Sequence, residues 1–330
     1  MVKIGVGVVG LGAFGEQHLD TLYKMTNVRI AAICSRSPER AKSLAVKYNV
    51  PRWYIDYREL VEDPMVDVVD VCTRDWEHVE PSVAAANAGK HIFLEKPIAG
   101  TISDGRKIFD AVESAGVIFM VGHILRFEER HLWLKQQIES GNLGKLAVIY
   151  LKRDVTRRNN FTGRAVSPIL GSQVHDIDLA LWLSDEQPTS IYTVKNHALE
   201  QQMPDVAVTV LTFTSGLVVT IQTVWLLPLA APRSIDAHLE VYGTAGSLRM
   251  NSMDQGVHLW LDDRVVHPET SVVSGIFNGA LRSELEYFIS CIQKGIQPSR
   301  ITKDEAWQAF ELACLAMESS ERHEIIELKN

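Results

Sequence analysis

A glycine-rich turn constrains the fold of this chain more than any other part of its sequence. Residues 10–15 read Gly-Leu-Gly-Ala-Phe-Gly; a continuous apolar run at residues 2–9 precedes them, and a helix pattern follows. A second apolar run at residues 28–34 completes a strand–helix–strand unit, the context in which G-x-G-x-x-G binds a dinucleotide. The turn backbone and the helix N-terminus would then hold the pyrophosphate. The expected contacts are Gly10, Leu11, Gly12, Ala13, Phe14 and Gly15.

The end of the second strand decides which dinucleotide fits. An acidic residue at this point would bind the ribose 2′-hydroxyl of NAD. This chain instead has Ser35 and Arg36, with Arg40 one turn later. A hydroxyl and two guanidinium groups can bind a 2′-phosphate through charge-assisted hydrogen bonds. The sequence therefore favours NADP, and NAD is the alternative if Arg36 is only a solvated surface residue.

The order of strand and helix patterns predicts an α/β fold with two domains. Further apolar runs at residues 66–72, 91–94 and 117–121 are separated by helix patterns, which indicates a parallel sheet covered on both faces. Beyond Gly122 long strands dominate, and short turns at residues 214–216 and 243–246 indicate two hairpins of an antiparallel sheet. We therefore expect a dinucleotide-binding domain at residues 1–122 and a second domain at residues 123–330.

Composition limits the partners and the compartment. The chain carries 33 Lys and Arg against 41 Asp and Glu, a net charge of -8, which disfavours nucleic-acid binding. No apolar run is long enough to span a membrane, and a strand pattern so near residue 1 leaves no room for a signal peptide. The four cysteines lack metal-ligand spacing and are expected to be reduced thiols. We therefore expect a cytoplasmic protein without a metal site.

Further motifs extend over nearly the whole chain and carry a family resemblance. Residues 88–97 read Ala-Gly-Lys-His-Ile-Phe-Leu-Glu-Lys-Pro, and residues 175–178 read His-Asp-Ile-Asp. Residues 122–127 include Gly-His and Arg-Phe, and residues 242–247 read Tyr-Gly-Thr-Ala-Gly-Ser. With the glycine turn, these motifs resemble the Gfo/Idh/MocA family, named for glucose–fructose oxidoreductase and inositol dehydrogenase. The resemblance implies an N-terminal Rossmann domain and a C-terminal α/β domain for substrate binding and oligomerisation, with a large, mostly antiparallel sheet.

The resemblance also implies an activity and a partner. The chain would be an NAD(P)-dependent oxidoreductase that transfers a hydride between nicotinamide and a hydroxyl or ketone carbon of a sugar, cyclitol or related polyol. It would assemble as a homodimer or homotetramer. Lys96 and His175 match the family's catalytic residues, and Asp178 matches a substrate contact. The matching cofactor contacts are Ser35, Arg36, Thr73, His78, Glu95, Lys96 and Arg126.

The residue types suit this chemistry, although the family pattern is incomplete. Lys96 can take or return the hydroxyl proton as the hydride moves, and the imidazole of His175 is a second candidate for this role. His175 and Asp178 lie three residues apart, so one helix face can present both to a ligand. Many sugar dehydrogenases of the family have Asp four residues before the histidine, where this chain has Gly171. The family's Pro-Asn in the cofactor loop is replaced here by Arg74-Asp75.

A basic segment at residues 152–164 leaves the substrate class open. Its arginines could clamp an anionic substrate group such as a carboxylate, phosphate or sulfonate, or they could belong to a solvated loop or a subunit contact. The candidate residues are Arg153, Arg157, Arg158 and Arg164. Three other functions stay open: a dihydrodiol or other carbonyl-substrate dehydrogenase, a catalytically silent NAD(P)-binding regulator, and an enzyme that holds its nicotinamide permanently.

Overall fold

The chain divides into two compact units. The computed structural model describes residues 3–157, 167–200, 202–252 and 279–328, together with the backbone of four short strands between residues 259 and 277. The first unit consists of Met1–Glu128 and Ser271–Trp307, and the second of Glu129–Thr270 and Gln308–Asn330. The first unit thus includes Ser271–Trp307, which the sequence patterns assign to the second domain.

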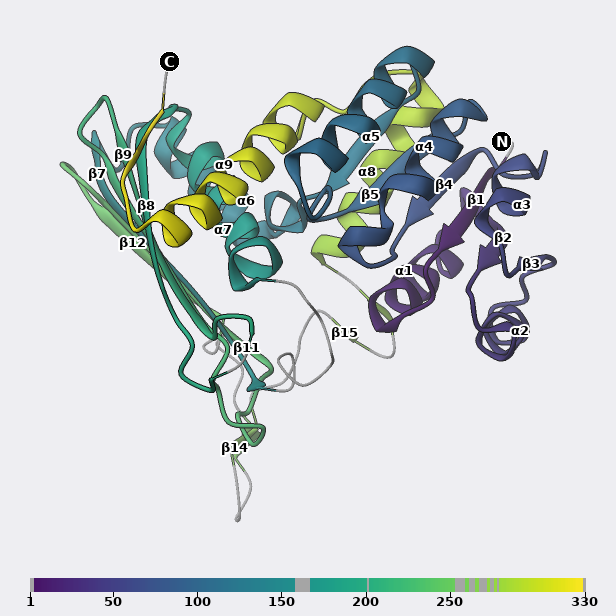
Figure 1. Cartoon of the computed structure of the whole chain (residues 1–330), viewed down its shortest axis with the longest axis horizontal. Helices are drawn as coiled ribbons and strands as arrows, with labels where there is room; N and C mark the ends of the chain where they lie inside the picture. Colours follow the sequence, from purple (N-terminus) through teal and green to yellow (C-terminus); the bar gives the residue numbers. More distant parts are fainter. Residues whose placement is uncertain are drawn as a thin grey trace. The chain divides into compact units, whose positions relative to one another are not determined.

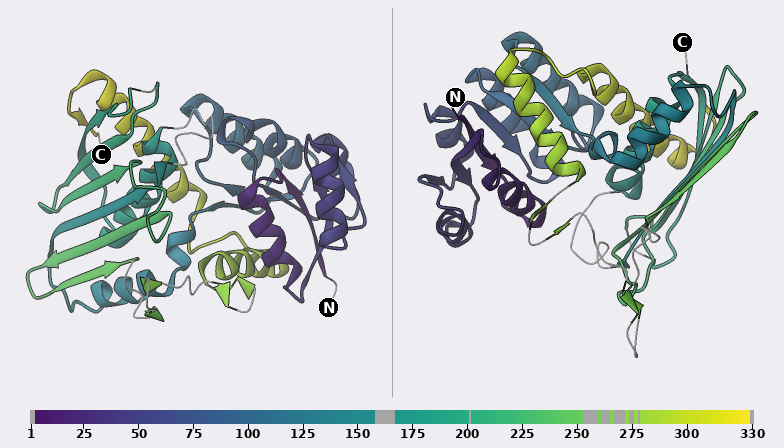
Figure 2. Two further views of the ribbon diagram at one scale, coloured as in Figure 1. Left: turned by 90° about the horizontal axis from the view of Figure 1, so that it is seen from below. Right: turned by 180° about the vertical axis from the view of Figure 1, so that it is seen from behind.

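The first unit contains a six-stranded parallel sheet, whose ribbon can be followed in Figures 1 and 2. Its strand order is β3-β2-β1-β4-β5-β6, and every neighbouring pair is parallel. This order is that of the Rossmann fold, as expected from the alternating patterns. The strands are β1 (Ile4–Val9), β2 (Val28–Cys34), β3 (Trp53–Tyr54), β4 (Val68–Val71), β5 (His91–Glu95) and β6 (Phe119–Gly122).

Local signals explain where several helices of this unit begin and end. The Ser37 hydroxyl caps α2 by accepting from the Arg40 N–H, with Pro38 in the first turn, and Gly116 ends α5 with φ 63°. The helices are α1 (Ala13–Tyr23), α2 (Pro38–Lys47), α3 (Tyr57–Glu62), α4 (Val79–Asn87), α5 (Ile102–Ala115) and α8 (Ala280–Lys294), with short turns η1 (Asp75–Glu77) and η2 (Ile124–Phe127).

Helix α8 joins the first unit through aromatic contacts. The Phe288 and Phe93 rings meet edge to face with centroids 5.5 Å apart, and Tyr287 packs on Phe127 at 5.5 Å. Gln297 donates to the Val117 carbonyl at 3.0 Å. Burial of this apolar surface explains why a segment distant in sequence belongs to the Rossmann unit.

The second unit contains a seven-stranded mixed sheet, mostly antiparallel as expected. Its order is β12-β11-β7-β10-β9-β8-β17, and β7 and β10 are its parallel pair. The expected hairpins β9–β10 and β11–β12 are confirmed. The strands are β7 (Leu146–Val155), β8 (Pro188–Asn196), β9 (Val206–Phe213), β10 (Val218–Val224), β11 (Ile235–Gly243), β12 (Ser247–Asn251) and β17 (Ile326–Glu327).

Helices lie on one face of this sheet (Figure 1). The Ser319 hydroxyl of α9 accepts from the backbone N–H of Thr193 on β8, which fixes α9 to that face. The helices are α6 (Glu129–Glu139), α7 (Val174–Ser184) and α9 (Lys303–Arg322), which begins in the first unit, and a π-helical turn η4 (Ile169–Gln173) precedes α7. Short strands form two further ladders: β13 (Leu259–Trp260) with β14 (Val265–Val266), and β15 (Val272–Val273) with β16 (Ile276–Phe277). In the part of the chain that the structure describes, no helix is long and apolar enough to cross a membrane.

Candidate active site

In the glycine turn after β1, the fold requires glycine at two positions and leaves empty space beside a third. Gly10 has φ 98°, and a Cβ on Gly15 would lie 2.0 Å from the Gly10 carbonyl oxygen. These two glycines let α1 approach β1 closely. A Cβ on Gly12, by contrast, would meet nothing within 4 Å, and among the described residues no side chain caps α1 there. The open space and the uncapped N–H groups fit a dinucleotide pyrophosphate.

This difference gives a prediction that separates folding from cofactor binding. Gly15→Ala forces a backbone clash and should lower the free energy of unfolding by about 1–3 kcal/mol. Gly12→Ala should leave unfolding unchanged but weaken dinucleotide binding by about tenfold or more, because its methyl group occupies ligand space. Urea denaturation and NADH or NADPH fluorescence titration measure the two effects. Unchanged dinucleotide affinity in Gly12→Ala would contradict the assignment of this turn.

The residues that follow β2 have partners of their own. Arg40 donates from Nε to the Leu11 carbonyl at 3.0 Å and pairs with Glu16 on α1, so it braces the glycine turn. Arg36 is largely exposed and pairs with Glu77, NH1 to Oε1 at 2.9 Å. The Ser35 hydroxyl accepts from the Ser37 N–H at 3.2 Å. The structure therefore leaves Arg36 as the exposed cation at this strand end and turns Arg40 toward the glycine turn.

His78 connects the loop after β4 to the turn after β5. It is buried, and its ring nitrogens lie 2.9 Å from the Pro97 carbonyl oxygen and 3.2 Å from that of Thr73. Burial lowers the pKa of His78, so the ring is neutral at physiological pH. Partly buried Lys96 directly follows β5, and its peptide bond to Pro97 is cis. His78 thus links Thr73 and the Lys96 turn: its single N–H donates to one of the two carbonyls, and its other ring nitrogen only contacts the second.

Asp75 adds an acidic group to the same loop. Its carboxyl is buried, and burial raises its pKa, whereas the positive charge of Lys96 acts in the opposite direction. At this position the chain has aspartate where the family pattern has asparagine. The structure shows that the aspartate lies within electrostatic range of Lys96.

Two residues expected to contact the cofactor, Glu95 and Arg126, have protein partners within the first unit. Glu95 is buried at the end of β5, with Oε1 3.3 Å from His18 Nε2. Arg126 is 1% exposed, and its NH1 donates to Glu305 at 2.7 Å and to the Arg300 carbonyl at 3.2 Å. Both side chains hold elements of this unit in place.

In the second unit, buried hydrogen bonds fix the turn that precedes His175. Gln173 donates to the Ala207 carbonyl at 2.9 Å and accepts from the Thr209 hydroxyl at 2.7 Å. Partly buried His175 and fully buried Asp178 follow on α7. The sequence motifs had not identified Gln173; an amide within an apolar helix pattern was the available signal.

The basic segment differs from the expectation. Strand β7 extends to Val155, so Arg153 lies within the strand and not in a solvated loop. Its guanidinium donates to both oxygens of Asp176, at 2.9 Å and 2.8 Å, and this buried pair allows a charge inside the strand. Arg157 is exposed and donates to the Leu226 carbonyl at 3.2 Å. Arg158 and Arg164 lie outside the described residues.

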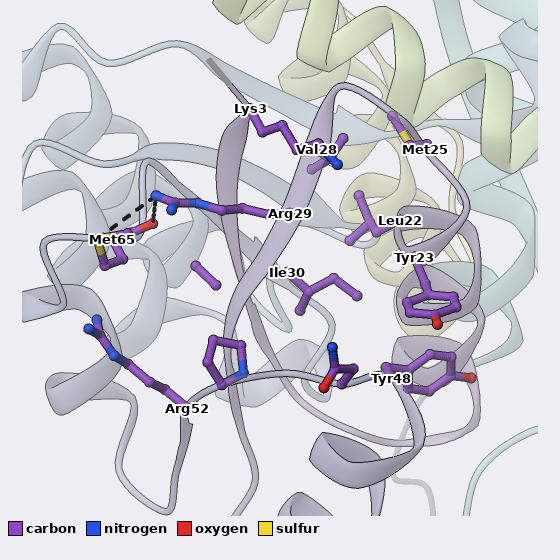
Figure 3. A pocket seen from close by; sticks show the side chains of 13 residues that line it. Lys3, Leu22, Tyr23, Met25, Val28, Arg29, Ile30, Tyr48, Arg52 and Met65 are labelled. Atoms are coloured by element: carbon purple, nitrogen blue, oxygen red, sulfur yellow. Dashed lines mark hydrogen bonds between the residues drawn. The ribbon is translucent and has the colours of Figure 1, made fainter. Parts of the chain in front are cut away.

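A pocket of about 480 Å³ lies elsewhere in the first unit (Figure 3). Tyr23 and Tyr48 lie near one another on its wall, and Arg29 donates to the Met65 carbonyl at 3.2 Å. Lys3 precedes β1 and Val28 begins β2, so the pocket lies at the amino-terminal ends of these strands. Dinucleotides bind at the carboxyl ends of such sheets, which separates this pocket from the candidate site.

Family models match both halves of the chain. Residues 4–123 match the GFO_IDH_MocA model, described as an oxidoreductase family with an NAD-binding Rossmann fold, and residues 131–249 match the GFO/IDH/MocA C-terminal domain. The chain belongs to the Gfo/Idh/MocA family. The expected family, fold class and nicotinamide-dinucleotide-binding Rossmann domain are thereby confirmed.

Relatives of this Gfo/Idh/MocA chain align over most of its length. Myo-inositol 2-dehydrogenase of Thermotoga maritima is 26% identical over 333 residues, 98% of each chain. Scyllo-inositol 2-dehydrogenase (NAD(+)) of Bacillus subtilis is 27% identical over 308 residues, 90% of this chain and 88% of the relative. These relatives confirm the expected class, a nicotinamide-dependent dehydrogenase acting on CH–OH groups.

A solved structure shares the fold. Scyllo-inositol dehydrogenase from Lactobacillus casei, solved with NAD(H) and scyllo-inositol, has a TM-score of 0.85 at 19% identity and covers 98% of this chain and 99% of its own. At that identity the likeness shows the fold alone.

The candidate residues of this family member fall into two groups. The first unit brings together the glycine turn, Thr73, His78 and Lys96, because β1, β4 and β5 are neighbours and end at the same sheet edge. The second unit carries His175 and Asp178 on α7. Lys96 thus belongs to the first unit and His175 to the second.

Proposed function

We propose that this oxidoreductase interconverts a secondary hydroxyl and a ketone on a ring carbon of a cyclitol or sugar. One observation carries the proposal: Lys96 follows β5 at the sheet edge where the open Gly12 turn follows β1. The inositol dehydrogenases named above support the substrate class. When bound, the nicotinamide dinucleotide accepts or supplies the hydride.

The roles of the side chains follow from their chemistry. Lys96 takes the hydroxyl proton during oxidation and returns it during reduction. His175 donates or accepts a hydrogen bond at the reacting oxygen, and Asp178 binds a neighbouring hydroxyl. Gly171 supplies no carboxylate, so Asp75, which lies within electrostatic range of Lys96, is the acidic group we assign to that lysine's surroundings.

We also propose a neutral substrate. Asp176 neutralises the charge of Arg153. Of the candidate arginines that the structure describes, Arg157 is therefore the one left to bind an anionic substrate group. The test is a turnover screen with NAD and NADP that pairs neutral cyclitols and sugars with their acidic counterparts. Turnover of neutral members supports the proposal, and turnover confined to acidic members would reverse it. Cofactor binding without any turnover would contradict the proposed reaction.

For the cofactor we retain NADP as the proposal, now resting on Ser35 and Arg36. NAD is the competing expectation, because the Bacillus subtilis relative is named for NAD(+). Loss of a hydrogen bond to a charged group costs about 1.5–3 kcal/mol. Arg36→Ala should therefore lower kcat/KM for NADPH by about tenfold or more and change that for NADH less than about twofold. A wild-type kcat/KM that is lower for NADPH than for NADH would contradict the proposal.

We propose a homodimer or homotetramer that pairs through the open sheet face. The face of the second-unit sheet turned away from its helices carries Val148, Tyr192, Val194 and Val218, each at least 36% exposed. Register places Val148 beside Val218 on neighbouring strands, so these two valines form one apolar patch. Light scattering at micromolar concentration tests it, and a monomer would contradict it.

A further inference from the structure

His18 lies at the centre of a buried polar cluster in the first unit. It is on α1, one turn after Gly15, and its side chain is fully buried. Its Nδ1 lies 2.9 Å from Asp70 Oδ2 on β4, and its Nε2 lies 3.3 Å from Glu95 Oε1 on β5. The Cys72 thiol donates to the second oxygen of Asp70 at 3.3 Å. One histidine thus contacts the elements that lead to the glycine turn, the Thr73 loop and Lys96.

The groups around this ring favour its protonated form. A neutral imidazole has one donor nitrogen and one acceptor nitrogen, so it would direct a lone pair at one of the carboxylates. An imidazolium donates from Nδ1 to Asp70 and places positive charge 3.3 Å from Glu95, although its Nε2 lacks hydrogen-bond geometry toward that carboxylate. Burial lowers the pKa of His18, but Asp70 and Cys72 together outweigh this effect and raise that pKa well above its ordinary value. Asp70 and Cys72 face the ring from β4, and Glu95 faces it from β5.

The surroundings leave Glu95 little freedom. A Cβ on Gly122 of β6 would lie 2.6 Å from Glu95 Oε1, so the β6 backbone confines this carboxylate on one side. His18 contacts it on another. The His18 ring is itself held by the edges of Phe14 and Phe93, with centroids 4.9 Å and 5.7 Å away. Phe14 belongs to the glycine turn, so packing extends from that turn through His18 to Glu95.

We propose that His18 is a positioning residue: as an imidazolium between Asp70 and Glu95, it holds the end of β5, and with it the turn carrying Lys96, against the helix of the glycine turn. The inference rests on the proposed function, because it treats Lys96 as the proton-transfer group. On this proposal, the buried cluster of His18, Asp70 and Glu95 contributes to catalysis by positioning Lys96.

The first test reads the charge of His18 in the wild-type protein. In protein labelled with ¹⁵N-histidine, His18 is assigned by its contacts with the Phe14 and Phe93 rings. Its ring should keep the imidazolium signature from about pH 6 to about pH 8. His78 and His91, whose pKa values are lowered by burial, serve as neutral references in the same spectra. A neutral His18 ring at pH 7.5 would overturn the inference.

The second test asks whether the charge positions Lys96. His18→Gln keeps a hydrogen-bond donor and removes the charge, and should lower kcat about 10- to 100-fold through misplacement of the reacting groups. His18→Gln/Glu95→Gln removes the excess negative charge and should recover kcat by roughly fivefold. His91→Gln, at the other end of β5, is the control and should keep wild-type kcat. Equal losses in the single and double variants would indicate a merely structural role.

Failure of this inference is distinguishable from failure of the proposed function. If the wild type turned over no polyol, the reaction proposal would fail, while the histidine spectra would still test the charge. NADH affinity gives a further readout: it should weaken in His18→Gln and recover in the double variant. Wild-type turnover combined with a fully active His18→Gln would overturn the positioning role alone.

Discussion

Replacing Lys96 by alanine is expected to lower kcat by about 10²–10⁴-fold, the range for losing a positioned proton-transfer group. The lysine follows β5 at the sheet edge that carries the open glycine turn. Its turn is anchored through His78, which contacts the Pro97 and Thr73 carbonyls, so the backbone next to Lys96 is held in place. Removing the ammonium group should lower kcat more than it weakens dinucleotide binding. Steady-state kinetics in both directions, with NAD and NADP, measure the change.

Two further variants sharpen this prediction. Lys96→Arg keeps the positive charge but cannot give up its proton, so its kcat should stay close to that of Lys96→Ala. Lys107→Ala removes an exposed lysine on α5 that pairs with Asp104, and should keep wild-type kcat. A Lys96→Ala enzyme with unchanged kcat would refute the role of this lysine and shift proton transfer to His175.

Replacing Arg153 by methionine should lower the free energy of unfolding by about 3–5 kcal/mol. The reason is the charge left behind: Asp176 is 1% exposed, and both of its oxygens accept from Arg153. A buried carboxylate without its cation is costly. Urea denaturation measures the change. Arg157→Met, four residues away and exposed, should change the free energy by less than about 0.5 kcal/mol.

The same pair of variants decides between two interpretations of the basic segment. An arginine that clamps a substrate would lose affinity for anionic substrates without loss of stability. An arginine that neutralises Asp176 should lose stability, and Arg153→Met/Asp176→Leu should regain part of it, because apolar replacements of buried ion pairs are often tolerated. Wild-type stability of Arg153→Met would favour the clamp.

The sequence predicts the parts of this molecule that local signals specify. Three glycines between a buried strand and a helix fix the turn after β1, and short polar turns fix the hairpins. Arg153 was misplaced because a charge normally ends an apolar strand, whereas here a distant aspartate neutralises it. His18 was missed for the same reason: its partners are 52 residues or more away. Asp70 was the available clue, since a carboxylate inside an apolar run needs a buried partner.

The discontinuity of the Rossmann unit has a consequence for biosynthesis. Phe288 of α8 completes packing around Phe93 of β5, yet the ribosome adds it only after the whole stretch between them. At typical translation rates of about 5–20 residues per second, roughly 10–40 seconds pass between the synthesis of β5 and the synthesis of Phe288. During that time the strands of the nascent amino-terminal segment expose apolar surface that α8 later covers. Chaperone protection of this chain is therefore needed most before its last helices emerge, when the glycine turn and Lys96 have long been synthesised.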